Sequence, residues 1–453
     1  MVPPVGRRAT RASDAPREEP AWILAGRAFV RGRLQPVEIA IGPDGRIQSI
    51  GRVRSGAPRT DVGDRVILPA ATDVHVHARE PGPESGIENL ATATVEAALG
   101  GVGLVGEMPN TTPPVTDPET LEEKAALVPG RAAVDVLLYA SPARPARRAA
   151  LARRAGAFKL YLAPTTGIPD PPALASVPGL LERLAPLGLP VSVHAEDPGA
   201  FHDGRRPGDL AEWNAHRPPA AETAAIGALV ARAPASLRLH VAHVTEASSA
   251  ARLRAAGVSF EATPHHLLLS DRSRVGTAGK VNPPLRSEAD RAALWAMFAR
   301  GEVPILASDH APHARSEKDR PFADAPSGLP GLETMLPLLL ARVRTGDLAL
   351  AVLVAAAADR PARWFGQPLG RIAPGHRANL LVVDFKVRTT IEARRLRSPC
   401  GWTPFEGGDA IFPQLHYRDG EAIVRDGEYV GTPTGRVVRP EFAPGEPLGP
   451  SAG

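Results

Sequence analysis

Short apolar runs alternate with alanine-, leucine- and arginine-rich stretches through the middle of the chain. Each run is bounded by glycine, proline or polar residues, which is typical of buried strands in a parallel sheet. Eight such runs cover residues 66–77, 102–110, 132–141, 156–162, 189–196, 237–244, 258–266 and 303–310. The stretches between them have helical length, for example Asn89–Leu99 and Ala220–Arg232. Eight strands alternating with helices predict an α/β fold, a (β/α)8 TIM-like barrel over residues 69–371.

The two ends of the chain show a different pattern, in which short strand-like runs are separated by glycine-containing turns. This pattern fills residues 21–68 and returns over residues 372–440. Two β-rich segments that bracket one barrel predict a small β-sandwich domain built jointly from both ends of the chain. Residues 1–20 have no apolar core and predict a disordered tail, and the proline- and glycine-rich residues 441–453 predict a loose one.

Composition and charge exclude several classes of protein. The chain has 453 residues and a formal net charge of only +4 with no basic tract, so we expect no binding to nucleic acid or to an anionic membrane. Its longest apolar run, Leu348–Ala358, is too short to span a bilayer, and its first residues do not form a secretory signal. The single cysteine, Cys400, excludes an internal disulfide framework and a thiolate-rich zinc site. We therefore expect a soluble cytoplasmic protein.

Lysine is rare in this chain. Of the 53 basic residues only five are lysines, which leaves 48 arginines. The five are Lys124, Lys159, Lys280, Lys318 and Lys386. This bias is compositional, but it raises the question of what arginine could not do at each position where a lysine remains.

Polar side chains gather at the carboxyl ends of the predicted barrel strands, where (β/α)8 proteins carry their chemistry. The first strand ends in Asp73, His75, His77 and Arg79, which the two-residue period of a strand places on one face. A lone histidine at a strand end is more often a capping or core residue than a ligand. Six side chains, however, share one relative position on five different strands, which chance seldom produces. They are His75, His77, Lys159, His194, His243 and Asp309.

This set indicates a metal centre. Four histidines and a carboxylate suit zinc, and they are too many for one open catalytic Zn²⁺ but about right for two ions that share a bridging group. Protonated Lys159 could not bridge them, but burial beside dications lowers the pKa of an amine, and reaction with carbon dioxide would give an anion with two oxygens. Arginine cannot undergo this change because its guanidinium stays protonated. The alternative is an unmodified lysine paired with Asp309 or Glu196.

The other histidines are interpreted differently. His240 lies within a strand and is expected to be structural. Four more lie in loops or in the small domain and are expected to be solvated, namely His202, His216, His376 and His416. For three others the choice between a structural and a functional role stays open, namely His265, His266 and His310.

The motifs around these residues resemble one enzyme family. DVHVHAREPG, MPNTTPP, GAFKLYLAPTTG, VSVHAED, HVAHVTEA, EATPHHLLLS, KVNPPLR, ASDHAPH, SGLPGLETMLPLLL and SPCGWTPFEG resemble the amidohydrolase superfamily, and within it the dihydroorotases of the carboxylated-lysine type. The resemblance covers roughly residues 65–435. It implies a cyclic amidohydrolase that reversibly hydrolyses (S)-dihydroorotate to N-carbamoyl-L-aspartate in de novo pyrimidine biosynthesis.

The resemblance also implies a role for each site residue. One Zn²⁺ would lie on His75 and His77 and the other on His194 and His243, with N6-carboxylated Lys159 as the bridge. Asp309 would complete the shell of the first ion and act as general base and then general acid. The implied substrate-binding residues are Arg79, Asn110 and His313 for the carboxylate and Asn282, Ser327 and Gly328 for the ring, and Thr165 and Thr166 belong to a flexible loop. In the animal-type domain a cysteine at the position of Ala242 helps the glutamate at Glu261 to hold a third zinc, so the alanine argues against a third metal.

Two kinds of alternative stay open. An allantoinase or a dihydropyrimidinase (hydantoinase) would share the metals and the barrel, but its substrate lacks the carboxylate that Arg79 would bind. An inactive homologue that serves as a partner of aspartate transcarbamoylase would be expected to have lost metal ligands, and the sequence retains all of those expected. The expected partners are the small-molecule substrate and, beyond it, a second copy of the chain or aspartate transcarbamoylase.

Overall fold

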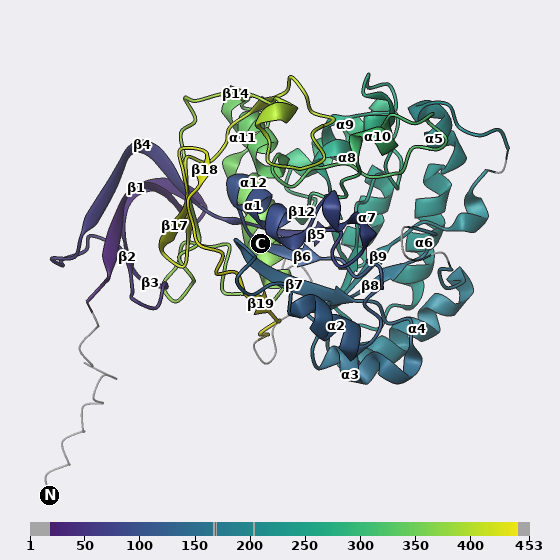
Figure 1. The fold of residues 1–453 in the computed structure, drawn as a ribbon, viewed down its shortest axis with the longest axis horizontal. Coiled ribbons are helices and arrows are strands. Elements are labelled where there is room, and N and C mark those ends of the chain that lie inside the picture. The colour runs from purple at the N-terminus through teal and green to yellow at the C-terminus, as the bar shows by residue number, and fades with distance from the viewer. Residues whose placement is uncertain (1–18, 166–167, 169, 203, 443–453) are drawn as a thin grey trace, which may run out of the picture.

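The centre of the molecule is a barrel of eight parallel strands, each paired with the next in chain order (Figure 1). The computed structural model describes residues 19–165, 168, 170–202 and 204–442. The barrel strands are β5 (Ala71–Val76), β6 (Val102–Glu107), β7 (Asp135–Ala140), β8 (Ala157–Tyr161), β9 (Val191–His194), β10 (Leu239–Val241), β11 (Ser259–Ala262) and β12 (Ile305–Leu306). The backbone N–H of His77 donates to the carbonyl oxygen of His310 at 2.8 Å, which brings the two ends of the sheet together. The predicted (β/α)8 barrel is confirmed.

Helices connect the strands and cover the outside of the barrel (Figure 1). The α-helices are α1 (Leu90–Leu99), α2 (Pro118–Ala125), α3 (Arg148–Ala152), α4 (Val177–Leu184), α5 (Leu210–His216), α6 (Pro219–Arg232), α7 (Ala247–Ala255), α8 (Pro264–Leu268), α9 (Glu288–Ala299), α10 (Arg315–Lys318), α11 (Met335–Thr345), α12 (Leu350–Val354) and α13 (Arg360–Trp364). The side chain of Asn89 accepts hydrogen bonds from the N–H groups of Ala91 and Thr92, which fixes the start of α1. Among the described residues, no helix is both long and apolar enough to cross a bilayer.

Shorter helical turns complete the connections. The 3-10 turns are η1 (Pro83–Gly86), η2 (Pro145–Arg147), η3 (Leu174–Ser176), η4 (Ala185–Leu187), η5 (Pro198–Ala200), η6 (Gly276–Gly279) and η8 (Ala393–Arg395). A π-helical turn, η7 (Ala355–Asp359), joins α12 directly to α13.

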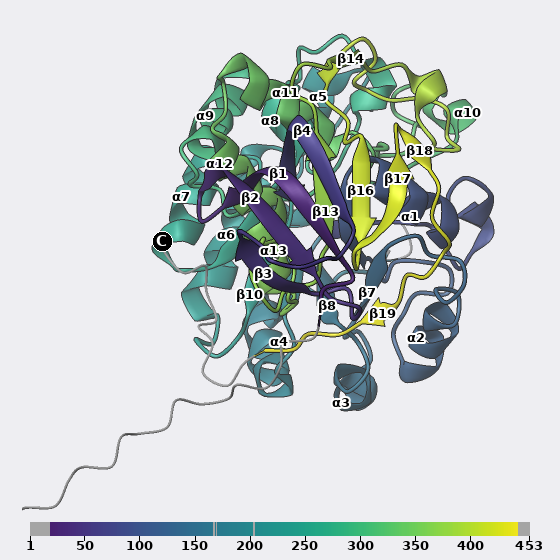
Figure 2. The ribbon, with the colours of Figure 1, turned by 90° about the vertical axis from the view of Figure 1, so that its left-hand side faces the viewer.

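Strands from both ends of the chain form one continuous sheet beside the barrel (Figure 2). They are β1 (Trp22–Val30), β2 (Arg33–Ile41), β3 (Ile47–Gly51), β4 (Arg59–Pro69), β13 (Leu380–Val383), β16 (Leu415–Arg418), β17 (Glu421–Arg425) and β18 (Glu428–Tyr429). The sheet encloses an apolar core of its own, which includes Leu24, Ile39, Val62 and Val382. The two halves meet where β4 pairs with β13, so the expected joint β domain is confirmed. Elsewhere β14 (Thr389–Thr390) pairs with β15 (Asp409–Ala410), and β19 (Val437–Val438) pairs with β7.

The apolar run at residues 66–77 forms two strands, whereas its pattern predicts a single barrel strand. β4 ends in the small sheet at Pro69, and β5 begins in the barrel at Ala71. The N–H of Ala70 donates to Asn379 and that of Ala71 to Gly101, each at 2.9 Å, so adjacent residues bond to different sheets. The last four residues of β4 and all of β5 are buried, and the apolar pattern therefore shows no break where the chain changes sheet.

Buried polar contacts hold the small sheet against the barrel. Asp135 on β7 accepts a hydrogen bond from Arg418 at 2.7 Å and pairs with Arg377. His416 on β16 is fully buried, and its Nδ1 lies 2.8 Å from the carbonyl oxygen of Ala98. The expectation that His416 is solvated is therefore wrong, because β16 is an internal strand that faces α1. Burial lowers the pKa of His416 to about 4.

The predicted tails at residues 1–20 and 441–453 lie mostly outside the described residues, which begin at Glu19 and end at Phe442. Glu19 accepts a hydrogen bond from the hydroxyl of Ser55 at 2.6 Å. The N–H of Glu441 donates to the carbonyl of Gly366 at 3.0 Å, and the guanidinium of Arg238 lies 3.7 Å from the ring centre of Phe442. Both described ends thus contact the folded chain.

Candidate active site and metal centre

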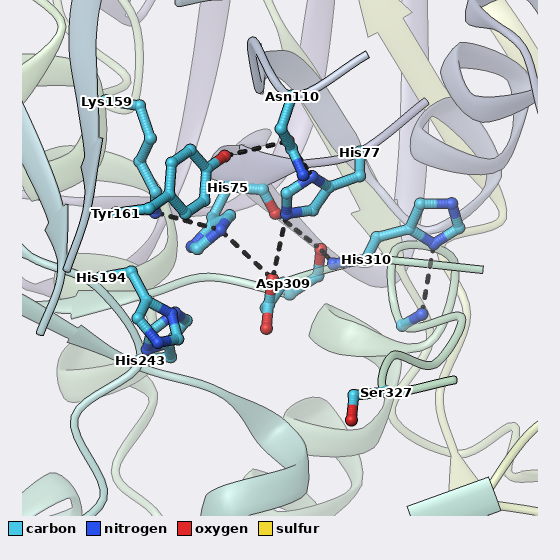
Figure 3. A network of polar contacts seen from close by, with 12 residues as sticks. His75, His77, Asn110, Lys159, Tyr161, His194, His243, Asp309, His310 and Ser327 are labelled. Carbon is cyan, nitrogen blue, oxygen red and sulfur yellow. Dashed lines mark hydrogen bonds and ion pairs between the residues drawn. The ribbon is translucent and has the colours of Figure 1, made fainter. Parts of the chain in front are cut away.

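The predicted site residues meet in one recess at the carboxyl ends of the barrel strands (Figure 3). The recess is lined by His75, His77, Arg79, Asn110, Tyr161, Thr165, His194, His243, Val281, Asn282, Asp309, Ala311, Ser327 and Gly328. Two predicted residues stand behind this lining: Lys159 contacts His75, and His313 contacts Arg79. Thr166 lies outside the described residues. The topology of the barrel thus brings together residues that are far apart in the sequence.

One group of potential ligands is formed by His75, His77 and Asp309 (Figure 3). The Nε2 atoms of the two histidines lie 3.2 and 3.4 Å from the same oxygen, Oδ1 of Asp309. Potential ligand atoms of the three residues lie within 4.8 Å of one another. Burial lowers the pKa of both histidines, so the rings are neutral and carry lone pairs that can bind a cation.

A second pair of potential ligands, His194 and His243, lies beside the first group. Nδ1 of His194 is 3.0 Å from Nε2 of His243, and Nε2 of His194 is 2.9 Å from the carboxylate of Glu196. Burial would raise the pKa of Glu196, but Arg217 and His194 hold it well below its ordinary value, so this carboxylate is ionised. It accepts the Nε2 proton of His194 and leaves the lone pair on Nδ1 facing His243. Two ring nitrogens aimed at one point fit a second metal ion.

Lys159 lies beside His75 of the first group (Figure 3), and its charge also acts on His194 and His243 of the second. Its side chain is fully buried, and Nζ lies 3.3 Å from Nε2 of His75. Within the part of the chain that the structure describes, Lys159 forms no ion pair with a carboxylate, and Glu196 is already engaged by Arg217 and His194. Burial lowers the pKa of Lys159 to about 8. The unmodified lysine paired with Asp309 or Glu196 is therefore not what the structure shows.

Hydrogen bonds at Nδ1 fix the orientation of the first two histidines. Nδ1 of His75 lies 2.5 Å from Glu261, and Nδ1 of His77 lies 2.8 Å from the side-chain oxygen of Asn110. Each contact turns the opposite nitrogen, Nε2, towards Asp309, as is typical of metal-binding histidines. The other oxygen of Glu261 lies 2.8 Å from Nε2 of His240, which agrees with the structural role expected for that histidine.

Several residues of the site were not selected from the sequence. Tyr161 lines the recess and donates from its hydroxyl to Asn110 at 2.9 Å. Glu196 and Arg217 form a buried ion pair behind His194. In the sequence, a charged residue at the end of an apolar strand could have indicated Glu196. No such pattern indicates Arg217, because arginine is common throughout the chain.

A buried cation, Arg79, lines the same recess. Arg79 is only 6% exposed, and its Nε donates to the carbonyl of Pro312 at 3.0 Å. One terminal nitrogen lies 3.1 Å from Nε2 of His313, and the other lies 3.6 Å from the carboxylate of Glu84. Burial lowers the pKa of His313 to about 2, so this ring is neutral and adds no second charge. The geometry suits recognition of an anionic group beside the candidate metal ligands.

The backbone is strained at three site residues. Arg79, His243 and Asp309 have φ angles of 61°, 37° and 46°, in the left-handed region that residues other than glycine seldom adopt. Each such conformation costs on the order of 1–3 kcal/mol and persists only where packing enforces it. All three residues lie just beyond barrel strands, where the bend turns their side chains into the site.

Known proteins provide an independent comparison. The sequence matches the Amidohydrolase family over residues 66–405. The chain is 37% identical to the dihydroorotase of Halobacterium salinarum over 92% of this chain and 99% of that protein. It is 35% identical to the dihydroorotase of Thermoplasma volcanium over 92% of this chain and 97% of that protein. The chain belongs to the amidohydrolase family, within its dihydroorotase group. The predicted family is thereby confirmed.

Solved structures of a hydantoinase and a dihydropyrimidinase share the fold. The L-hydantoinase (dihydropyrimidinase) from Arthrobacter aurescens superimposes with a TM-score of 0.85 at 27% identity, over 92% of this chain and 99% of that chain. The dihydropyrimidinase from Brevibacillus agri has a TM-score of 0.82 at 23% identity, over 93% of this chain and 99% of that chain, which bears on the fold alone. The barrel and the terminal sheet are thus an architecture common to this amidohydrolase and its structural neighbours.

Proposed function

We propose that this protein is a dihydroorotase, which reversibly hydrolyses (S)-dihydroorotate to N-carbamoyl-L-aspartate in pyrimidine biosynthesis. The observation that carries the proposal is the buried guanidinium of Arg79 in the same recess as the histidine and aspartate cluster. A cyclic amide with a carboxylate substituent would meet both groups at once. The dihydroorotases of Halobacterium salinarum and Thermoplasma volcanium, which match most of the chain, support this substrate.

The proposed cofactor is a pair of Zn²⁺ ions. His75, His77 and Asp309 would hold one ion and His194 and His243 the other, because their neutral imidazoles and a carboxylate converge without any thiolate. When bound, such ions supply Lewis acidity towards a carbonyl oxygen and make a nearby water more acidic. Lys159, fully buried beside His75 and near enough for its charge to act on His194 and His243, is the proposed bridging residue in its N6-carboxylated form. Its lowered pKa favours the neutral amine that carbon dioxide requires.

The chain's own residues would orient the substrate and move one proton. Asp309 would accept a proton at its carboxylate from the attacking water and transfer it to the leaving amide nitrogen. Arg79 and Asn110 would bind the substrate carboxylate and so select which face of the ring meets the water, with His313 supporting Arg79 from behind. Asn282, Ser327 and Gly328 line the opposite wall, where the ring would lie. Thr165 at the recess, with Thr166, would belong to the loop that covers the substrate.

A substrate comparison tests the proposal. The purified protein is expected to open dihydroorotate and to leave allantoin and dihydrouracil unchanged, because neither of these substrates offers a carboxylate to Arg79. The structural similarity to hydantoinases makes dihydropyrimidinase the second candidate. Comparable rates on dihydrouracil or allantoin would reject the assignment, and metal analysis of the same sample tests the two-ion centre.

Partners and location are also proposals. Association with a second copy of the chain or with aspartate transcarbamoylase, and a cytoplasmic location, rest on resemblance alone. Light scattering on the purified protein, with and without aspartate transcarbamoylase, tests both associations.

A further inference from the structure

Two of the rare lysines lie behind the recess wall that is formed by Ser327 and Gly328. Lys280 precedes the recess residues Val281 and Asn282, and Lys318 is the last residue of α10. They are only 4% and 2% exposed. Among the described residues neither forms an ion pair with a carboxylate, so both ammonium groups depend on other acceptors.

Backbone carbonyl oxygens surround each of the two lysine nitrogens. Nζ of Lys280 donates to the carbonyls of Phe322 at 2.7 Å, Ala323 at 3.2 Å and Ala325 at 2.7 Å. Nζ of Lys318 donates to the carbonyls of Lys280 at 3.3 Å, Pro326 at 2.9 Å and Gly328 at 3.0 Å. The two side chains therefore bind five of the seven carbonyls of the segment 322–328 and link this segment to Lys280.

The geometry of these contacts explains why arginine does not replace lysine here. An ammonium group has three N–H donors that diverge from one nitrogen, whereas the donors of a guanidinium spread over one plane. Three carbonyls around a single point therefore match lysine. Burial lowers the pKa of Lys280 to about 8 and that of Lys318 to about 7. The carbonyls oppose this effect, because a neutral amine would turn its lone pair towards one of the oxygens.

The segment held by the lysines reaches the substrate side of the recess. The N–H of Gly328 donates to the carbonyl of Lys280 at 2.9 Å, and the carbonyl of Ser327 lies 3.0 Å from Nε2 of His313. Gly328 has a φ of 136°, and a Cβ atom there would lie 2.5 Å from the carbonyl oxygen of Ala311. The backbone is thus packed tightly on one side and tied to the lysines on the other.

We propose that Lys280 and Lys318 are positioning residues that fix the segment 322–328, so that its backbone at Ser327 and Gly328 forms a rigid wall for the substrate ring. Neither lysine lines the recess itself, and both reach it through the backbone of Gly328. The two lysines would therefore affect how tightly the substrate ring binds. They would not affect the chemical step, which depends on the candidate metal ligands and Asp309. The choice of dihydroorotate as the test substrate rests on the proposed function.

The test compares K280M and K318M with K386M. Methionine keeps much of the apolar stem and removes the ammonium, and Lys386 pairs with Asp64 at the surface, where its side chain is 74% exposed. At pH 7 we expect KM for dihydroorotate to rise tenfold or more in K280M and K318M, with kcat changed less than threefold and bound metal unchanged. K386M should match the parent protein. Unchanged KM in both buried variants, or an equal fall of kcat with loss of metal, would overturn the proposal.

Two further measurements keep the test decisive. K280R and K318R keep the positive charge but change the geometry of its donors, so they remain informative if the methionine variants do not fold. We expect KM for dihydroorotate to rise in both arginine variants. A KM equal to that of the parent protein would overturn the proposal. Hydrogen–deuterium exchange needs no substrate, and the amides of 322–328 should exchange faster in K318M than in K386M. Unaltered exchange in folded K318M contradicts the proposal. If the parent protein does not open dihydroorotate but the exchange difference appears, the proposed function fails and the positioning role stands.

Discussion

At the scale of single residues, the site depends on which nitrogen of each histidine is engaged behind the recess. Glu261 holds Nδ1 of His75, and Glu196 holds Nε2 of His194, so the two rings present opposite nitrogens to the centre. A sequence shows that a histidine is present but not which nitrogen is free. Lys159 is different, because its residue type among 48 arginines already indicates the chemistry of an amine, and its full burial agrees with that interpretation.

Replacing Lys159 tests the bridging role. Lys159→Ala should lose bound metal and activity, because the proposed bridging side chain beside His75 is removed. Added formate or acetate should restore part of both, since a small carboxylate supplies two oxygens in the vacated space. Zinc content and dihydroorotate hydrolysis are the measurements, with Lys386→Ala as the control. Full activity of Lys159→Ala without added acid would contradict the bridging role.

Replacing Arg79 tests anion recognition. Arg79→Met should keep its metal but weaken substrate binding by about 2–5 kcal/mol, as expected when one partner of a buried charge pair is truncated. That loss corresponds to a rise in KM of roughly thirtyfold or more. Arg315→Met is a matched control, because Arg315 pairs with Asp319 at the surface with 64% of its side chain exposed. Parental KM in Arg79→Met would remove the basis for choosing dihydroorotate over dihydrouracil.

At the scale of elements, burial has two effects. It hides the boundary between two consecutive strands, and it shifts the pKa of a carboxyl group in the loop that follows β12. The run at 66–77 is buried from Val66 to Val76, so its change from the small sheet to the barrel at Ala70 leaves no mark in the apolar pattern. Beyond β12, Glu333 is likewise buried before α11, and its carboxylate accepts from the N–H of Arg397 at 2.7 Å. Burial raises the pKa of Glu333 from 4.5 to about 7.

Glu333 should make folding stability depend on pH. A carboxyl whose pKa is higher in the folded state stabilises the fold below pH 4.5, and this contribution is lost as the pH rises through about 7. The difference corresponds to about 3 kcal/mol. Glu333→Gln should therefore gain stability relative to the parent protein between pH 5 and pH 8, as measured by urea unfolding at both values. Glu428→Gln, at an exposed partner of Arg397, should show no such gain. An equal difference from the parent at both pH values would contradict the assignment.

At the scale of the whole molecule, a buried ion cluster joins the barrel to the terminal sheet. Asp135 is fully buried on β7 and meets Arg377 and Arg418 from the small domain. Burial alone would raise the pKa of Asp135, but the two arginines hold it below its ordinary value. The carboxylate therefore contributes stability above pH 4, and this contribution is lost as the pH falls through its lower folded-state pKa.

Asp135→Asn should destabilise the protein by about 3 kcal/mol at pH 7, because it leaves buried Arg418 with only the more distant carboxylate of Asp419, at 3.9 Å. Asp409→Asn is the control, since Asp409 pairs with Arg388 at the surface with 52% of its side chain exposed. Thermal and urea unfolding measure the difference, which should shrink below pH 4. Equal stability of Asp135→Asn and the parent protein at pH 7 would show that the interface does not depend on this cluster.

The sequence by itself determined the barrel, the joint β domain and the positions of the candidate ligands. These follow from local patterns, because alternating strands and helices bring every strand end to one rim. Only the tertiary structure decided how the side chains pair. Glu261 meets His75 across 186 positions, His416 is buried against α1, and Lys280 and Lys318 share the carbonyls of one segment. These contacts depend on closure of the barrel and on the docking of the sheet, which bring together residues that no local pattern relates.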